Sequence, residues 1–325
     1  MKKLLALGLA LCLLPHFPAR ASGPRIAICA YAGKDTFIQS MMTELRERAQ
    51  GRAQLLIASA DGDQNRQNDQ VQEMIKAGVD VLAVNPVDRT SAVYLIRLAR
   101  QNNLPIVLFN REPLREDLRL YSKAYYVGID PRQQGRLQAE LAVQYFKDHP
   151  ERDFNGDGVI QYVLLRGEPG HQDAELRSSA AQQALSESGL AVEKLAEESA
   201  NWEKALGQER MAMLLNSLGR SIECVLSNND DMALGAIDAL KAAGYFSGSR
   251  SIPVIGVDAT AAALDMIEQE TLYGTVQNDG AAQAQAVIDL SILLASGSEI
   301  TADTFHFPIE DKVVYIESEI VRKED

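Results

Sequence analysis

The stretch from residue 63 to residue 88, DQNRQNDQVQEMIKAGVDVLAVNPVD, combines the pattern of a helix with that of a strand. Apolar residues recur at helical spacing over 64–77, and a short apolar run rich in Val and Leu follows over 79–84. Such a run has no polar face, so a strand formed from it is buried on both sides, as in a parallel sheet covered by helices. The stretch therefore predicts a helix that leads into a buried parallel strand.

The same alternation of apolar runs and helical spacing continues along the chain and forms two series. We expect strands at 25–30, 54–59, 79–84, 105–109 and 125–129, and in the second series at 159–165, 191–197, 222–226, 252–257 and 272–276. Helices are expected at 36–50, 64–77, 88–102, 131–147, 173–188, 202–217, 230–243 and 279–295. Two such series predict an α/β fold with two doubly wound parallel-sheet lobes, whose ligands bind beyond the carboxyl ends of the strands.

Length and composition agree with two domains that each have a core, because the chain has 325 residues, 46% of them hydrophobic and 24% charged. The formal net charge of −13 gives a surface that repels nucleic acid and anionic membranes, so neither is an expected partner. Cys29 and Cys224 fall in different series. We therefore expect two isolated buried thiols, although an oxidising compartment would permit a disulfide between them.

The amino-terminal residues MKKLLALGLALCLLPHFPARAS have the pattern of an export signal. Two lysines precede an apolar run over 4–14, and a small-residue cleavage site follows at 19–21. The pattern predicts that 1–21 is a cleaved signal peptide and that the mature chain is secreted to the periplasm, since the apolar run is too short to span a bilayer. A lipid-anchored alternative needs a small residue before Cys12, where the sequence has Leu11.

Polar and aromatic side chains gather just beyond the predicted strand ends of both series. If the two lobes face each other across a cleft, these side chains converge on a small molecule. Amides and carboxylates bind adjacent hydroxyls in pairs, and aromatic rings cover the C–H faces of a sugar, so the mixture predicts a site for a neutral polyol. The candidate residues are Asp35, Phe37, Asn110, His171, Asp173, Arg177, Trp202, Asn229, Asp258 and Asn278.

Several of these residue types also occur for purely structural reasons or in a different kind of site. Asp35 and Asp258 could be helix caps in βα loops. Trp202, the single tryptophan, could equally be a partly buried surface aromatic. As paired carboxylates, Asp35 with Asp173 or Asp258 would suit a glycosidase. Arg177 disfavours that enzyme, because it keeps neighbouring carboxylates ionised whereas a glycosidase needs one protonated acid.

Residues 153–164, DFNGDGVIQYVL, have the oxygen ligands of a calcium loop at alternate positions. Gly158 stands at the sixth position, where the loop needs a sharp turn, but Leu164 occupies the twelfth, which requires a bidentate glutamate. Leu164 belongs to the predicted strand at 159–165 and cannot be a ligand. An ordinary Asx/Gly turn is the alternative to a calcium site.

Several longer segments carry a resemblance to a known family. They are DQNRQNDQVQEMIKAGVDVLAVNPVD, PIVLFNREP, KAYYVGID, YVLLRGEPGHQDAELR, LSNNDDMALGAIDALKA, IPVIGVDA and GTVQND. From Arg25 to Val314 the chain resembles the periplasmic galactose/glucose-binding proteins of the type I clamshell family. The resemblance implies two lobes joined by three hinge crossings, near 128–130, 277–279 and 315–318. The implied lobes are 22–128 plus 279–314 and 129–278 plus 315–325.

The resemblance also implies roles for the candidate residues, all of which match the family's sugar site by position. Phe37 and Trp202 would sandwich the sugar ring. Asp35 would accept a hydrogen bond from the hydroxyl whose orientation separates glucose from galactose, so that both epimers are tolerated. For the loop at 153–161, the family supplies the missing carboxylate from a distant strand. The implied ligands of a structural Ca²⁺ are Asp153, Asn155, Asp157, the Val159 carbonyl, Gln161 and Glu223.

The resemblance thus predicts a monomeric periplasmic receptor that captures D-glucose or D-galactose, performs no reaction, and delivers the sugar to an ABC permease, with a chemoreceptor as a further partner. An insertion at 244–250 and a different carboxyl-terminal tail depart from the family pattern and bear on partner contacts. The main alternative is a binding protein for another monosaccharide or polyol such as ribose, because the fold does not fix the sugar. A sugar-responsive transcription regulator would need a basic DNA-binding headpiece where this chain has its signal peptide.

Overall fold

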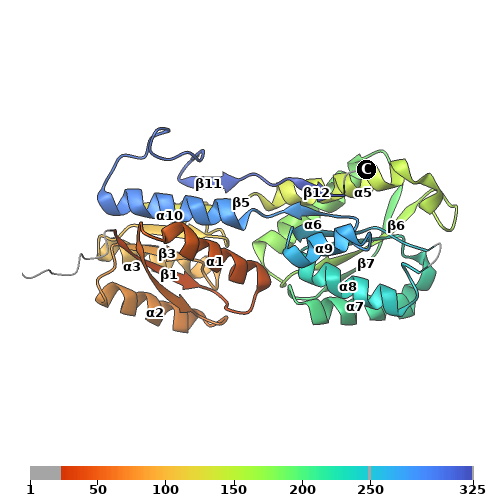
Figure 1. Cartoon of the computed structure of the whole chain (residues 1–325), viewed down its shortest axis with the longest axis horizontal. Helices are drawn as coiled ribbons and strands as arrows, with labels where there is room; N and C mark the ends of the chain where they lie inside the picture. Colours follow the sequence, from red (N-terminus) through yellow and green to blue (C-terminus); the bar gives the residue numbers. More distant parts are fainter. Residues whose placement is uncertain (1–22, 248–249, 324–325) are drawn as a thin grey trace, which may run out of the picture.

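The chain forms two six-stranded sheets, each flanked by helices (Figure 1). The computed structural model describes residues 23–247 and 250–323, so the predicted signal peptide lies outside the described residues, as do positions 248–249 of the expected insertion. The strand order is β11-β5-β4-β3-β1-β2 in the first sheet and β12-β10-β9-β8-β6-β7 in the second. We call each sheet with its helices the first and the second lobe. The predicted α/β fold with two parallel-sheet lobes is confirmed.

The elements have the following bounds. The first sheet contains β1 (Arg25–Ala30), β2 (Gln54–Ser59), β3 (Val81–Val84), β4 (Ile106–Phe109), β5 (Ala124–Ile129) and β11 (Val313–Ile316). The second contains β6 (Ile160–Arg166), β7 (Val192–Ser199), β8 (Cys224–Ser227), β9 (Val254–Asp258), β10 (Gly274–Gln277) and β12 (Ile320–Arg322). The helices are α1 (Thr36–Ala49), α2 (Gln64–Lys76), α3 (Ala92–Gln101), α4 (Arg115–Leu118), α5 (Pro131–Asp148), α6 (Gln172–Glu187), α7 (Lys204–Leu218), α8 (Asp230–Ala242), α9 (Ala261–Glu268) and α10 (Gly280–Ser296).

The structure differs from the predicted elements in a few places. The strands β11 and β12 and the helices α4 and α9 were not predicted, and all four are short. The pairing is parallel throughout both sheets except at one edge, where the unpredicted strand β12 pairs antiparallel with β10, with Val276 opposite Ile320. The expected helix at 88–102 is divided into a 3₁₀ turn at Arg89–Ser91 and α3. Asp88 caps that turn by accepting from the Thr90 amide.

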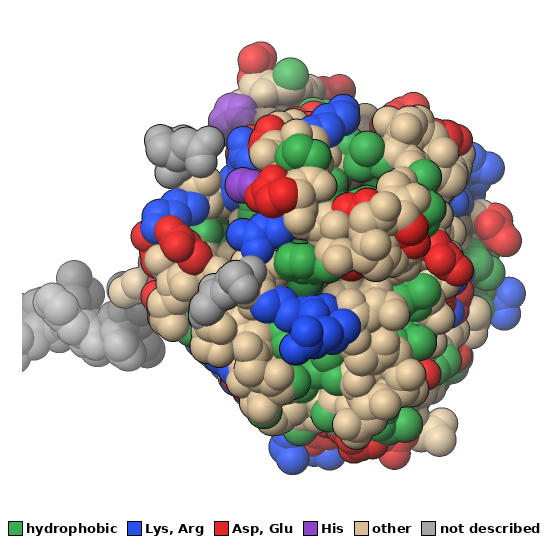
Figure 2. All heavy atoms as spheres, turned by 90° about the vertical axis from the view of Figure 1, so that its right-hand side faces the viewer, with side chains coloured by type: hydrophobic (Ala, Val, Ile, Leu, Met, Phe, Trp, Pro, Cys, Tyr) green, Lys and Arg blue, Asp and Glu red, His purple; other side chains and the backbone are tan. Residues whose placement is uncertain are grey.

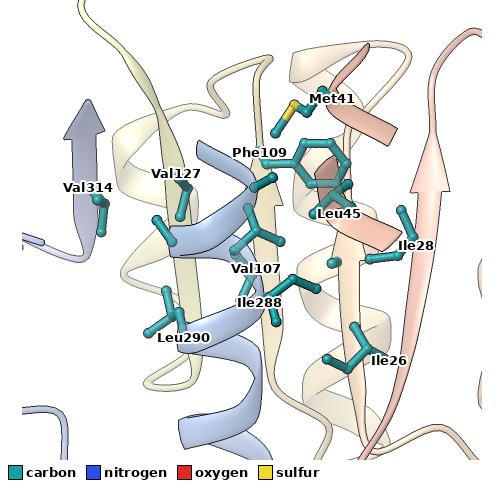
Figure 3. Packing of buried hydrophobic residues seen from close by; sticks show 14 of the residues in the cluster. Ile26, Ile28, Met41, Leu45, Val107, Phe109, Val127, Ile288, Leu290 and Val314 are labelled. Carbon is teal, nitrogen blue, oxygen red and sulfur yellow. The ribbon is translucent and has the colours of Figure 1, made fainter. Parts of the chain in front are cut away.

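The inner strands β1, β3 and β4 of the first lobe are buried on both faces, as their apolar sequences predict, whereas the edge strand β2 is only partly buried. Along β1, Ile26 and Ile28 pack into one core cluster and Ala27 and Cys29 into another on the opposite face. Figure 3 shows the first cluster, in which side chains from β1, β4, β5 and β11 meet those of α1 and α10. Because α10 follows a strand of the second sheet yet packs on the first, the chain has already returned to the first lobe there.

The chain passes between the two sheets after β5, after β10 and after β11 (Figure 1). These passages fall close to the three expected hinge crossings. The assignment of 22–128 plus 279–314 to one domain and 129–278 plus 315–325 to the other stays a prediction, because pairing within sheets does not by itself define units that move.

Two further features of the described chain bear on its chemistry. Cys29 and Cys224 are free and buried, as expected, and burial raises the pKa of the Cys29 thiol to about 12. Within residues 23–247 and 250–323, helices that could cross a membrane are absent. Figure 2 shows the outer end of the second lobe, where acidic, basic and apolar side chains are interspersed.

Candidate functional site

Every residue predicted for the polyol site lines one pocket, which lies where the carboxyl ends of strands from both sheets meet. Two other residues complete its wall, Tyr31 and Ile38. Tyr31 stands directly after β1 and has the position of the predicted residues, so a wider use of the strand-end rule would have found it. Ile38 is a buried apolar residue of α1 that carries no sequence signal for a polar site.

Asp35 has two roles at the start of α1. Its Oδ1 accepts from the Ile38 amide at 2.9 Å, which makes it the helix cap, and its Oδ2 accepts from the Tyr31 hydroxyl at 2.7 Å. The guanidinium carbon of Arg111 lies 3.8 Å from the centre of the Tyr31 ring and holds that ring in place. Burial and the Asp35 carboxylate raise the pKa of Tyr31, so this hydroxyl remains a donor to Asp35. Asp35 is therefore a helix cap, as its βα-loop position allowed, and it lines the pocket as well.

Trp202 is half-buried and is held from several sides. Its backbone has a positive φ of 69°, and its carbonyl accepts from the Asn229 side-chain amide at 3.1 Å. The His171 ring meets it edge-on with centres 5.1 Å apart. Gly167 lies so close to the indole that a Cβ there would be 2.1 Å from the ring atom Cζ2. Trp202 thus packs on the second-lobe core and also lines the pocket, so it is more than a surface aromatic.

The start of α6 contributes a histidine, a carboxylate and a guanidinium. His171 caps the helix through Nδ1, which accepts from the Asp173 amide at 3.1 Å, and burial lowers the pKa of His171 well below its ordinary value. Burial raises the pKa of Asp173 to about 6, in spite of the opposing effects of Arg177 and Arg111. Arg177 is 3% exposed and donates to the Asn228 carbonyl and to Gln134. The imidazole is therefore neutral beside a buried cation.

Asp258 ends β9, and its Oδ1 accepts from the side-chain amide of Asn278 at 3.1 Å. A helix-capping role is wrong for Asp258, because Thr260 caps α9. Burial, and then the nearby Asp230, raise the pKa of Asp258 well above its ordinary value. At the end of β4, Asn110 accepts from the Asn85 amide at 3.1 Å, and this bond orients its side chain in the pocket wall.

The pocket can therefore bind a neutral molecule that offers many hydroxyls. Among the ion pairs between described residues, none includes Asp35, Asp173 or Asp258, so these carboxylates lack a cation that would satisfy them directly. Carboxylates that are removed from water need hydrogen-bond donors. Hydroxyl groups supply such donors without adding charge, and the amides of the wall can both donate and accept.

Among the described residues, three contacts join the two lobes near the pocket. The Thr36 hydroxyl donates to Asp231 Oδ2 at 2.6 Å. Arg111 forms an ion pair with Glu168 at 2.9 Å, and the Gln172 amide donates to Glu112 at 3.1 Å. All three bring a residue of the first sheet's loops or helices against one of the second. The two lobes are therefore in direct contact beside the pocket.

The residues of the predicted calcium loop also lie together. Asp153 accepts from the amides of Gly156 and Gly158, both at 2.8 Å, and so shapes the turn. Glu223, which is 1% exposed, reaches the loop from the start of β8, and its two oxygens accept from the amides of Phe154 at 2.7 Å and Gln161 at 3.2 Å. A group of three His, Cys, Asp or Glu side chains in metal-binding geometry is not found in the described part of the chain.

Comparison with known proteins agrees with this geometry. The profile of the family described as "Periplasmic binding protein domain" matches residues 26–299. The D-galactose/methyl-galactoside binding periplasmic protein MglB of Haemophilus influenzae is 39% identical over 299 residues, which cover 91% of this chain and 88% of that protein.

Two solved structures are similar over nearly the whole chain. An ABC transporter periplasmic solute binding protein from Actinobacillus succinogenes with bound D-allose has a TM-score of 0.78 and 22% identity, covering 92% of this chain and 97% of that one. An ABC transporter solute binding protein from Bacillus halodurans with bound myo-inositol has a TM-score of 0.76 and 29% identity, covering 93% and 95%. The chain therefore belongs to the periplasmic binding protein family, and it is a solute-binding protein rather than an enzyme.

Proposed function

We propose that this protein captures D-glucose or D-galactose in the pocket between its lobes. The observation that carries the proposal is the set of three carboxylates, Asp35, Asp173 and Asp258, that line one pocket without an ion-pair partner among the described residues. Hydroxyls of a sugar donate to such groups in charge-assisted hydrogen bonds. The similarity to the Haemophilus influenzae galactoside-binding protein supports a hexose as the ligand.

The two aromatic residues support a ring-shaped ligand. Phe37 comes from α1 in the first lobe, and Trp202 comes from the loop before α7 in the second. A sugar ring between them has both C–H faces covered when the lobes close. Asp35, fixed by Tyr31 and by the Ile38 amide, is the acceptor for the hydroxyl in which the two epimers differ.

The proposal extends to what happens after binding. Sugar that binds the closed lobes better than the open ones shifts the protein toward the closed form. That form is presented in the periplasm, as a monomer, to the membrane subunits of an ABC sugar permease, with a chemoreceptor as a further partner. The names of the relatives, which are periplasmic and ABC transporter proteins, support this delivery role.

Titration of the sugar-stripped mature protein with glucose, galactose, ribose and myo-inositol, followed by Trp202 fluorescence, tests the ligand. Trp202 is the single tryptophan, so the signal reports on the pocket itself. We expect a saturable response to glucose and galactose at micromolar concentration, which corresponds to about −8 kcal/mol, and no response to ribose. Calorimetry without heat for either hexose would refute the proposal.

A second candidate ligand class is another monosaccharide or a cyclic polyol. The Bacillus halodurans structure, which holds myo-inositol, shares 29% of its residues with this chain and favours it. An inositol ring also presents hydroxyls around two apolar faces. Saturable binding of myo-inositol or ribose in the same titration, with silence for both hexoses, would select this class.

We further propose that the loop at 153–161 holds a structural Ca²⁺ through Asp153, Asn155, Asp157, the Val159 carbonyl, Gln161 and Glu223. The supporting observation is Glu223, a buried carboxylate whose pKa is raised by burial, with the neighbouring Asp153 adding to the effect. A cation between Glu223 and Asp153 would offset the free-energy cost of burying the ionised Glu223 carboxylate. The donors are carboxylate, amide and carbonyl oxygens, which suit calcium, and the ion would tie a surface loop to β8 without touching the sugar.

A further inference from the structure

Three consecutive residues at the start of α8 have side chains with three different partners. Asn229 caps the helix, accepts from the Met232 amide at 3.0 Å and lines the sugar pocket. Asp231 accepts from Thr36 across the lobes. Asp230, between them, is fully buried and does not line the sugar pocket. The sequence rule that found Asn229 gave Asp230 no role of its own.

The Asp230 carboxylate holds the loop that follows β9. Its Oδ1 accepts from the Thr275 hydroxyl at 2.7 Å, and its Oδ2 accepts from the Thr260 amide at 2.8 Å. Thr275 Oγ1 in turn lies 3.4 Å from the Ala259 amide, which donates to it. A Cβ on Gly256 would be 2.1 Å from Asp230 Oδ1, so the carboxylate fits only because β9 has glycine there.

The loop held in this way is strained. Asp258 has a φ of 125° and Ala259 a φ of 57°, and neither is glycine. Such conformations are unfavourable for residues with a side chain and persist only where surrounding contacts fix them. The strained residue Asp258 is itself a carboxylate of the pocket, where it accepts from Asn278. The carboxylate of Asp230 has one oxygen for the Thr275 hydroxyl and one for the Thr260 amide. Its negative charge also lies in the first turn of α8, where the helix dipole stabilises it.

We infer that Asp230, together with Thr275, is a positioning residue that holds the bend at Asp258 and Ala259 and thereby aims the Asp258 carboxylate into the pocket. The inference rests on the proposed sugar function of that pocket. Asp230 makes no contact with the ligand, and its effect on affinity passes through Asp258.

A double-mutant cycle on sugar binding tests this route. We expect Asp230→Ala to weaken glucose binding by calorimetry roughly tenfold or more, but to have little effect when Asp258→Ala is already present, because coupled residues are not additive. Asp230→Asn should restore part of the affinity, since one amide oxygen can still accept one of the two donors. Thr275→Val, nearly isosteric, should weaken binding in the same direction and replaces Asp230→Ala if that variant does not fold.

Leu185→Ala is the matched control, because it removes a buried second-lobe side chain outside the pocket and should lower the melting temperature without changing the Kd. An Asp230→Ala loss of the same size in both backgrounds, or an unchanged Kd, would overturn the inference.

A crystal structure of the variant separates this inference from the proposed ligand. We expect the bond between Asp258 and Asn278 to be lost and the bend to relax in Asp230→Ala, or in Thr275→Val. If that bond and the positive φ of Asp258 persist, positioning by Asp230 is wrong, whatever the pocket binds. If wild-type protein binds no sugar while the variant's bend relaxes, the proposed function fails and the positioning role stands.

Discussion

Gly167→Ala should weaken sugar binding without removing any group that touches the sugar. A Cβ at this position would lie 2.1 Å from Cζ2, 2.3 Å from Cη2 and 2.4 Å from Cε2 of Trp202, whereas ordinary contact begins near 3.4 Å. The indole must therefore retreat by about 1.3 Å, and overpacking of this kind typically costs about 1–3 kcal/mol. If the displaced ring loses that much from its stacking on the sugar, the Kd rises roughly 5- to 150-fold.

Calorimetric titration with glucose and galactose measures this loss, and near-ultraviolet circular dichroism reports whether the ring has moved. The hydrogen bond that the Gly167 amide donates to the side-chain oxygen of Asn228, at 3.1 Å, is kept in the variant. As a control, Gly167→Ala in a Trp202→Leu background should change thermal stability little, because the atoms it would meet are gone. A wild-type Kd for both sugars in the Gly167→Ala protein would refute the reasoning.

Four further predictions address the carboxylates and the contact between the lobes. Glu223→Gln should lower the melting temperature and abolish its dependence on calcium while sugar selectivity is kept; equal melting temperatures with and without chelator in the wild type would contradict a calcium site. Sugar hydroxyls favour the ionised form of Asp173, whose pKa is raised to about 6 in the empty pocket, so sugar affinity should fall as the pH drops through 6. Calorimetric titration measures this, and a Kd that does not change with pH would contradict the prediction. In the unliganded protein the raised pKa of Asp173 makes the stability of the fold fall, not rise, with increasing pH. Protonated Asp173 stabilises the fold at low pH, and this contribution is lost as the pH rises through about 6, which thermal melts would detect. Asp231→Ala should raise the sugar Kd a few-fold, because it removes the hydrogen bond that Thr36 donates across the lobes in the closed form, and Thr36→Val should do the same. Small-angle scattering should find the variants as compact as wild type with saturating sugar but less compact than wild type without sugar. An unchanged Kd in both variants would contradict this prediction.

Much of the fold could be predicted because it is encoded locally. The helices α2, α5 and α8 begin at Asp63, Asp130 and Asn229, which accept from amides of the first turn, and their apolar spacing continues to their ends. The inner strands β3, β4 and β8 are buried along their whole length and are made almost entirely of apolar residues, which made them recognisable in the sequence. By contrast, β12 has only three residues and pairs with β10 after the chain's last passage between the lobes, so its partner is brought to it by the tertiary fold.

The residues of the candidate site could be predicted where they directly follow the carboxyl end of a strand. Position relative to the strands pointed to the residues around Asn229, but it could not assign Asn229, Asp230 and Asp231 to separate partners. Those assignments depend on the direction in which each side chain leaves the helix start, and on Gly256 and Thr275 in strands far along the chain. Tyr31 was missed because a tyrosine after a strand looks like a core residue until the carboxylate beside it is seen.

The start of α8 also limits how this chain can diverge in evolution. Its three consecutive side chains serve the pocket, the β9 loop and the closure contact, and each depends on the angle at which it leaves the helix. Replacement of one side chain leaves the other two in place, whereas insertion or deletion of a single residue in this turn rotates all of them by about 100°. Descendants that acquire a new ligand are therefore expected to differ here by substitution, with the spacing from β8 to α8 preserved.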